Sequence, residues 1–277
     1  MRQRITVAGA YAALAMACGS GTGGAIGPTD ASGDGTAAAD APDDAGADGA
    51  SDAGADTLVE AESGAPTWCD GLSPKPAFCD DFDRGAVGAR WDAIVQTTGS
   101  SLAFDQAIFV SAPQSIAMRS KNANSGEVGS VLLRKTVLAS PARAKLSFDF
   151  AGDPVPASGG PVWIATLDVS LNHLFTLYLR DDGTTPAPAL VEQAPVVGQT
   201  RNTFALPATT GQFVRVEIDL DLSAQKADVR FGGTTVLSQI AIAGGAASEA
   251  TVRIGALTNG PQPAYAARFD NLTLELQ

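Results

Sequence analysis

The sequence predicts an all-β fold, an antiparallel two-sheet β-sandwich of the jelly-roll type, over residues 67–277. Three observations predict it. Apolar and polar residues alternate with a period of two in many short segments, which is the pattern of half-buried strands. Glycine and proline separate these segments, and no long window shows the helical period of about 3.6 residues. About 210 residues are enough for one hydrophobic core, and many short strands favour a sandwich or jelly roll.

Residues 1–18 carry the pattern of an export signal. Two arginines precede Ile5–Ala17, which is apolar or small throughout. This length suits a signal peptide and is too short for a bilayer span of about 20 residues. The stretch ends at Cys18 and resembles the lipobox of bacterial lipoproteins, although Leu14 lies one position further from the cysteine than in that pattern. We expect a lipid on Cys18, and the alternative is ordinary cleavage and secretion.

Residues 19–66 predict a disordered acidic linker. They contain eight Asp, two Glu, no Lys or Arg and no aromatic side chain. Such a segment cannot bury enough apolar surface to offset its chain entropy. The whole chain carries a net charge of −12, to which the leader contributes +2 and the linker −10, so the folded domain carries only −4. We expect no nucleic-acid partner, because a nearly neutral domain offers no basic patch.

The strands follow from the alternation. In Val214–Leu222 the apolar residues share one face, and Arg215, Glu217, Asp219 and Asp221 share the other. Further strands are expected at 145–150, 162–171, 173–179, 227–231, 234–242, 252–257 and 268–276. Two glycines between 227–231 and 234–242 predict a hairpin.

The chain has three cysteines. An odd number in an exported protein asks for a separate role for one of them. If Cys18 carries lipid, Cys69 and Cys79 remain, and an oxidising compartment would join them as a disulfide. A zinc site is not expected, because two cysteines cannot complete it and the only histidine lies far away in the sequence.

Both ends of the domain resemble a known superfamily. The segment FCDDFD (78–83) followed by RWD (90–92) resembles the opening strand of the concanavalin A-like lectin/glucanase superfamily. The segments RIGA (253–256) and RFDNLTL (268–274) resemble its ending, and residues 213–237 resemble a hairpin of laminin-G-like domains. This resemblance implies that the first and last strands are neighbours in one sheet. The fold by itself does not define a function.

The resemblance also implies a structural calcium site where the first and last strands meet. Asp270 is the residue expected to bind the ion, with Asp83 as a second ligand. Carboxylate and carbonyl oxygens are the ligands that calcium prefers. The alternative is that Asp270 ends a loop and that Asp83 lies on an exposed edge strand.

One carboxylate motif resembles a catalytic strand. Retaining glucanases of this superfamily carry Glu-x-Asp-x-Glu, with one Glu as nucleophile and the other as acid/base. Here Glu217, Asp219 and Asp221 share a strand face, as that chemistry requires. Asp221 is one methylene shorter than the expected Glu, and no aromatic residue adjoins the motif. We expect a solvated strand face, and a glycosidase using Glu217 and Asp221 is the alternative.

Trp163, Tyr178 and His173 are the candidate ligand-binding residues. Trp163 and Tyr178 fall on neighbouring predicted strands, and aromatic rings can stack on the apolar faces of sugars. His173 is the only histidine and lies at a strand start. The alternative is that the rings belong to the core and that the histidine is structural.

These features predict a non-catalytic carbohydrate-binding or adhesion domain on an exported lipoprotein, and not an enzyme. The expected partner is a polysaccharide or surface glycan, and the lipid is the expected membrane contact. Gly19 after the cysteine resembles the signal for transit to the outer membrane. We expect no cofactor other than the structural calcium. A glycoside hydrolase and a purely structural envelope protein are the alternatives.

Overall fold

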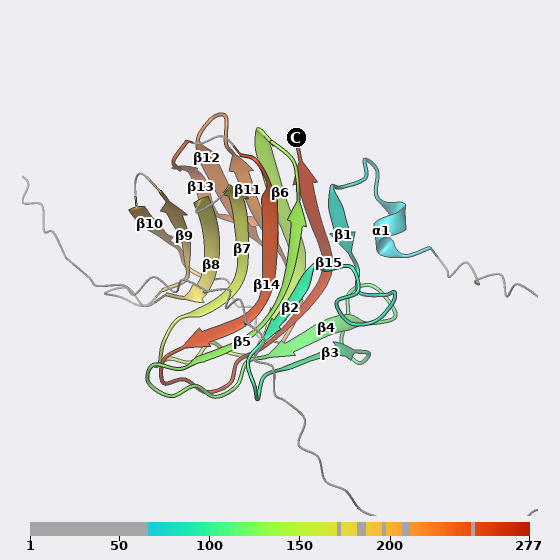
Figure 1. The fold of residues 1–277 in the computed structure, drawn as a ribbon, viewed down its shortest axis with the longest axis vertical. Helices are drawn as coiled ribbons and strands as arrows, with labels where there is room; N and C mark the ends of the chain where they lie inside the picture. Colours follow the sequence, from blue (N-terminus) through green and yellow to red (C-terminus); the bar gives the residue numbers. More distant parts are fainter. Residues whose placement is uncertain (1–65, 171–172, 182–186, 196–197, 207–210, 245–246) are drawn as a thin grey trace, which may run out of the picture. The chain divides into compact units, whose positions relative to one another are not determined.

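The structure is a computed structural model that describes residues 66–170, 173–181, 187–195, 198–206, 211–244 and 247–277. Cys18, the predicted signal peptide and the predicted linker up to residue 65 lie outside the described residues. Within these ranges the chain forms fifteen strands and one short helix, α1 (Trp68–Gly71). The strands form two antiparallel sheets, seen as two layers in Figure 1. The predicted all-β sandwich is confirmed.

The eight-stranded sheet has the order β13-β12-β11-β6-β15-β4-β3, with β1 also paired to β15. Its strands are β1 (Phe78–Asp80), β3 (Ser101–Asp105), β4 (Ser115–Arg119), β6 (Arg143–Gly152), β11 (Val214–Asp221), β12 (Lys226–Phe231), β13 (Thr234–Ala241) and β15 (Ala266–Leu276).

The seven-stranded sheet has the order β10-β9-β8-β7-β14-β5-β2. Its strands are β2 (Ala93–Gln96), β5 (Val128–Val137), β7 (Val162–Ser170), β8 (His173–Arg180), β9 (Ala189–Ala194), β10 (Gly198–Thr203) and β14 (Ala250–Asn259).

The core lies between the sheets and is filled by alternate residues of the strands. Phe269 of β15 is fully buried between Phe148 and Phe150 of β6, with ring centroids 5.6 and 5.7 Å apart. Apolar side chains of β7 and β14 in the other sheet, among them Ile164 and Ile254, complete this core. The other half of the side chains therefore face outward on two outer surfaces.

The first and last strands are neighbours, as the resemblance implied. Phe78 of β1 lies opposite Leu274 of β15, while β4 pairs with the earlier part of the same strand, from Ala266 to Phe269. Because β6 pairs with β15 throughout, β4 and β1 share its other edge. At the junction between them the register shifts, and Asn271 takes a left-handed conformation with φ of 48°. Asn adopts this conformation more readily than most residues do.

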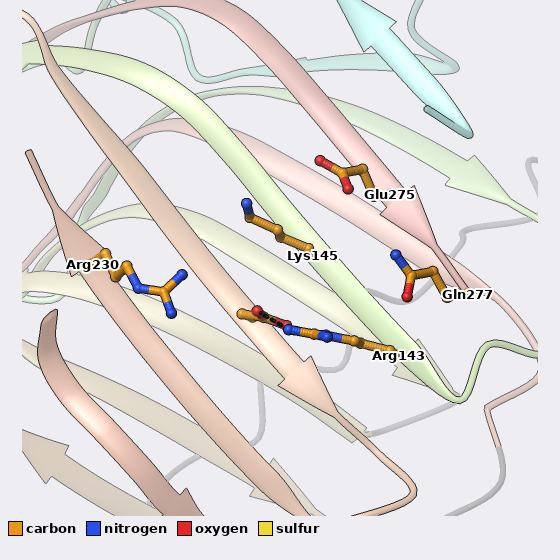
Figure 2. A pocket seen from close by; sticks show the side chains of 6 residues that line it. Arg143, Lys145, Arg230, Glu275 and Gln277 are labelled. Carbon is orange, nitrogen blue, oxygen red and sulfur yellow. Dashed lines mark hydrogen bonds and ion pairs between the residues drawn. The ribbon is translucent and has the colours of Figure 1, made fainter. Parts of the chain in front are cut away.

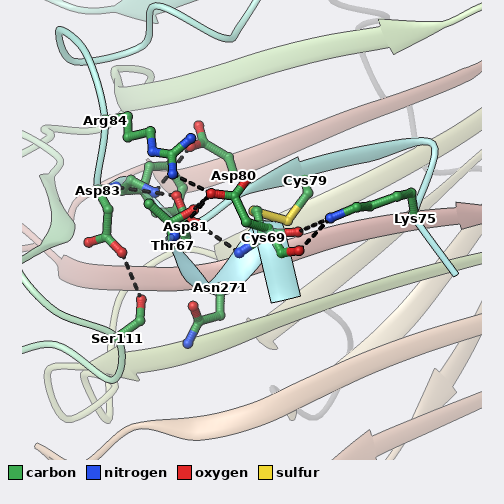
Figure 3. Close-up of a disulfide and its surroundings, with 12 residues drawn as sticks. Thr67, Cys69, Lys75, Cys79, Asp80, Asp81, Asp83, Arg84, Ser111 and Asn271 are labelled. Carbon is green, nitrogen blue, oxygen red and sulfur yellow. Dashed lines mark hydrogen bonds and ion pairs between the residues drawn. A yellow bond between two sulfur atoms is a disulfide. The ribbon is translucent and has the colours of Figure 1, made fainter. Parts of the chain in front are cut away.

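A disulfide fixes α1 to the edge of this sheet. Cys69 in α1 is bonded to Cys79 in β1, as predicted from the cysteine count. The buried carboxylate of Asp81 accepts a hydrogen bond from the Cys69 N–H at 2.8 Å, and Lys75 donates to the Cys69 carbonyl at 3.1 Å (Figure 3). The start of the domain is thus held by a covalent bond and by buried polar contacts.

The predicted strands correspond to β6, β7, β8, β11, β12, β13, β14 and β15. Strands β2 to β5, β9 and β10 were not predicted. β10 illustrates the reason: it is polar and every residue is exposed or half-exposed, so it shows no apolar alternation. No helix in the described part of the chain has the length and apolar character needed to cross a membrane.

Replacing Phe269 by alanine should destabilise the domain by about 3–5 kcal/mol, because it leaves a cavity between two buried rings. Urea unfolding followed by tryptophan fluorescence measures this. Leu138→Ala is the control, since Leu138 is 83% exposed and its truncation should cost no more than about 0.5 kcal/mol. Equal losses in the two variants would contradict the described core.

Candidate functional site

The outer face of the seven-stranded sheet carries the candidate site. Strand pairing aligns outward side chains into rows that cross the sheet. The central row contains Arg134, Arg253, Thr166, Thr176 and Val191, from β5, β14, β7, β8 and β9 respectively. The hydroxyl oxygens of Thr166 and Thr176 lie 3.3 Å apart. Charged and hydroxyl side chains therefore lie side by side across four strands, and Val191 ends the row on the fifth.

A hollow with a volume of about 380 Å³ lies at one end of this face. It is lined by Arg134, Thr136, Asp168, Ser170, Leu174, Glu249, Thr251 and Arg253. The hydroxyl oxygens of Thr136 and Thr251 lie 2.9 Å apart. The lining combines two guanidinium groups, two carboxylates and three hydroxyls, which suits a ligand rich in oxygen atoms.

Only one of the two arginines that line the hollow forms an ion pair with a described carboxylate. Arg253 forms an ion pair with Asp168, whose side chain is only 13% exposed. Burial raises the pKa of the Asp168 carboxyl, although Arg253 beside it opposes the rise. Arg134 is exposed, and no carboxylate of the described residues lies within ion-pairing distance of it.

Trp163 and Tyr178 lie on the same outer face, next to each other on β7 and β8. Leu257 of β14 lies on the other side of Trp163, and the register shifts there in both strand pairs. Such bulges re-aim side chains. Trp163 is 9% exposed and Tyr178 is half-buried, so Tyr178 offers the more accessible ring.

The structure does not bring His173 together with these rings. Its Nε2 lies 2.9 Å from Oε1 of Glu192, and the two side chains are 4% and 2% exposed. The imidazole packs against Phe175, with ring centroids 4.9 Å apart. Oε1 of Glu192 also accepts a hydrogen bond from the Ala243 N–H at 2.7 Å. Glu192 was not singled out in the sequence, because it lies on a strand that shows no simple alternation.

Glu217 and Asp219 lie on the outer face of the other sheet, within a charged network. Figure 2 shows its three cations, Arg143, Lys145 and Arg230. Nε of Arg143 donates to Asp219 at 2.8 Å, and Nζ of Lys145 lies 2.6 Å from Glu217. Arg230 lies 3.4 Å from Glu217. Burial acts to raise the pKa of Glu217, but the two cations outweigh it and lower the pKa. A lowered pKa is unfavourable for a proton donor.

Asp221 is also hydrogen-bonded, by residues of the turn that follows its strand. Its carboxylate accepts hydrogen bonds from the Ala224 N–H and the Ser223 hydroxyl, both at 2.7 Å. These contacts lower the pKa of Asp221. Figure 2 shows the small hollow beside the network, about 240 Å³, with Glu275 and Gln277 at its border. All three carboxylates of the motif thus have polar partners in the fold.

The carboxylates of Asp270 and Asp83 both lie within hydrogen-bonding distance of the Ser111 hydroxyl. The Ser111 hydroxyl lies 3.1 Å from Asp270 and 3.4 Å from Asp83. The N–H groups of Val110 and Ser111 also donate to Asp270, at 2.7 and 3.0 Å. Burial raises the pKa of each of the two carboxyls to about 6.

These residues provide the kind of donor atom that calcium binds, but too few of them to complete its coordination shell. Two carboxylates and a hydroxyl are hard oxygen donors of the kind that calcium binds. Within the described ranges no three His, Cys, Asp or Glu side chains gather closely enough to hold a metal ion. The remaining ligands would be oxygen atoms of the backbone or of water.

No protein-family model and no curated protein matches the chain. Among solved structures, an endo-β-1,4-glucuronan lyase from the fungus Trichoderma reesei is similar with a TM-score of 0.57 and 11% identity, over 73% of this chain and 96% of the lyase. The cellulose-induced protein Cip1 is similar with a TM-score of 0.54 and 13% identity, over 71% of this chain and 96% of that protein.

At these identities the likeness concerns the fold, a jelly-roll sandwich that fits the concanavalin A-like architecture. It contradicts the prediction of a non-catalytic binding or adhesion domain that is not an enzyme, because a polysaccharide lyase shares nearly the whole domain. The sequence did not indicate this, because the catalytic pattern that it resembles is the glycosidase motif of Glu217, Asp219 and Asp221. Arg134, Arg253 and Asp168 were not singled out, since their meeting depends on strand register.

Proposed function

We propose that residues 67–277 form a polysaccharide-cleaving enzyme whose site is the outer face of the seven-stranded sheet. The hollow lined by Arg134, Arg253 and Asp168, on the same face as Trp163 and Tyr178, carries this proposal. A polar hollow with aromatic side chains elsewhere on the same sheet face suits a carbohydrate. The fold likeness to the glucuronan lyase makes elimination the first reaction class to test.

Elimination places specific demands on such a site. A base removes the proton on the carbon next to a sugar carboxylate, and the bond from the neighbouring carbon to the linking oxygen breaks. A carbon–carbon double bond forms, and the departing oxygen takes a proton. Tyr178 and Asp168 are two side chains of this face that can exchange a proton, and a nearby cation would stabilise the developing charge.

The purified protein should shorten a polysaccharide and form an unsaturated sugar product, detected by ultraviolet absorbance and mass spectrometry. Tyr178→Phe and Asp168→Asn each remove one proton-exchanging group, and at least one of them should lower kcat by about 10²–10⁴-fold. Asp221→Asn on the opposite face is the control and should keep the activity. Full activity in both site variants, or the absence of any cleaved product from a panel of neutral and acidic polysaccharides, would overturn the proposal.

We also propose that Asp83 and Asp270 hold a calcium ion. A buried carboxylate and a half-buried one, joined by one serine hydroxyl, support this, since a divalent cation would offset their charge. Their raised pKa values mean that, without metal, their contribution to stability is present below about pH 3.9 and is lost as the pH rises through about 6. Calcium would compensate for this loss near pH 7.

Calcium should therefore raise the Tm of the chelator-treated protein more at pH 7 than at pH 5, where protons compete for the carboxylates. At a calcium concentration of about 100 times Kd, the free energy of unfolding should increase by about 2.7 kcal/mol. Scanning calorimetry with and without calcium measures it. Asp83→Asn should abolish the gain and Asp221→Asn should keep it. An unchanged Tm at both pH values would overturn the calcium proposal.

We further propose that the chain is exported and lipidated at Cys18, with residues 19–66 as an acidic linker to the domain at 67–277. The leader and its lipobox-like ending support this. In a bacterial host, radiolabelled palmitate should label the wild type and not Cys18→Ser. An unlabelled wild type released into the medium would favour the secreted alternative.

A further inference from the structure

We propose that the cross-strand pair Arg134 and Arg253 binds a sugar carboxylate, which makes an acidic polysaccharide the substrate class. This inference rests on the proposed function and assigns a recognition role to one part of its site. It concerns binding, so it can be tested apart from catalysis.

The two arginines are placed together by strand register. Arg253 of β14 lies directly opposite Arg134 of β5, and both line the hollow. Like charges directly opposite each other on neighbouring strands are destabilising. The fold keeps this unfavourable pair on an open face, where an anion bound between the two groups would compensate it.

Only one of the two arginines forms an ion pair within the described part of the chain. Asp168 pairs with Arg253, whereas no described carboxylate lies within ion-pairing distance of Arg134. On the opposite outer face, Arg143 and Arg268 are paired with Asp219 and Asp105 respectively. Arg119 there also has no described ion-pair partner, but unlike Arg134 it does not line the hollow of its face. Arg134 is thus a cation without an ion-pair partner among the described side chains. The nearby Asp92 carboxylate is paired with Lys135 instead, and its pKa is lowered by Lys135 and, to a smaller extent, by Arg134.

The position of the carboxylates restricts where an anion can bind. Asp168 is on β7, which is separated from β5 by β14, so its backbone lies about 10 Å from that of Arg134. A ligand carboxylate on the Arg134 side would avoid Asp168 and would accept paired hydrogen bonds from a planar guanidinium. A densely charged sulfated chain would meet Asp168 and Glu249 in the same hollow.

The neighbouring groups suit the rest of a sugar. Thr136 and Thr251 place two hydroxyls beside the arginines. Leu257, next to Trp163, is four residues beyond Arg253 on β14, which corresponds to roughly 10–13 Å along the strand. A chain of several sugars would therefore reach both the arginine pair and the aromatic side chains.

Isothermal titration with a β-1,4-glucuronate oligosaccharide tests the inference. The wild type should bind it more tightly than a neutral β-1,4-glucan oligosaccharide or a sulfated one of equal length. Arg134→Ala should weaken binding about 10- to 100-fold, because a charged hydrogen-bonding partner is lost, and Arg134→Lys should recover only part of it. Arg119→Ala is the matched control, an exposed arginine of the other sheet. A Tm that is not lowered should show that the Arg134 variants fold, since removal of one charge from a like-charge pair should not destabilise the sheet.

Equal affinity of Arg134→Ala and wild type for the glucuronate, or equal affinity of the wild type for the neutral chain, would overturn the inference. Cleavage of a neutral polysaccharide without Arg134-dependent glucuronate binding would overturn it and leave the proposed enzyme standing. Arg134-dependent binding without cleavage of any polysaccharide would support the inference and count against the enzyme.

Discussion

The alternation of side chains along antiparallel strands sets both the core of this domain and its two outer faces. Every second residue enters one shared core, where Phe269 packs between Phe148 and Phe150. The residues between them must then lie on one of two outer faces. Burial of the core thus decides which polar side chains are available for function, because a shift of one residue would exchange the two sets.

The two outer faces use their charges differently. On the eight-stranded sheet, Asp219 and Glu217 lie in ion pairs with Arg143 and Lys145, so the carboxylates act in a charged surface network. On the seven-stranded sheet, Arg134 lacks such a partner among the described side chains and also lines a hollow, whereas Arg119 of the other sheet lacks a partner but lines no hollow of its face. A ligand gains most from charged groups that the protein itself has not already neutralised, which is why the second face is the better candidate for a site.

The junction of β1, β4 and β15 joins the two ends of the folded domain at the proposed calcium site. Two strands share one edge of β15, and Asp270 lies where they meet. The sequence resemblance placed Asp83 and Asp270 together, and the fold brings both to Ser111. The resemblance could do this because it concerned neighbouring strands. The resemblance did not indicate the loop around Ser111. In this loop, the N–H groups of Val110 and Ser111 donate hydrogen bonds to the Asp270 carboxylate.

Local patterns were enough to predict the sandwich class, eight of its strands, the Cys69–Cys79 bond and the outward direction of Glu217 and Asp219. These features depend on local alternation or on a count of cysteines. The pairing of Arg134 with Arg253 and the burial of His173 against Glu192 become visible only in the folded chain. Such meetings depend on the register and order of strands that are distant in the chain, and hydrogen bonds between backbones set that register without any local signal in the sequence.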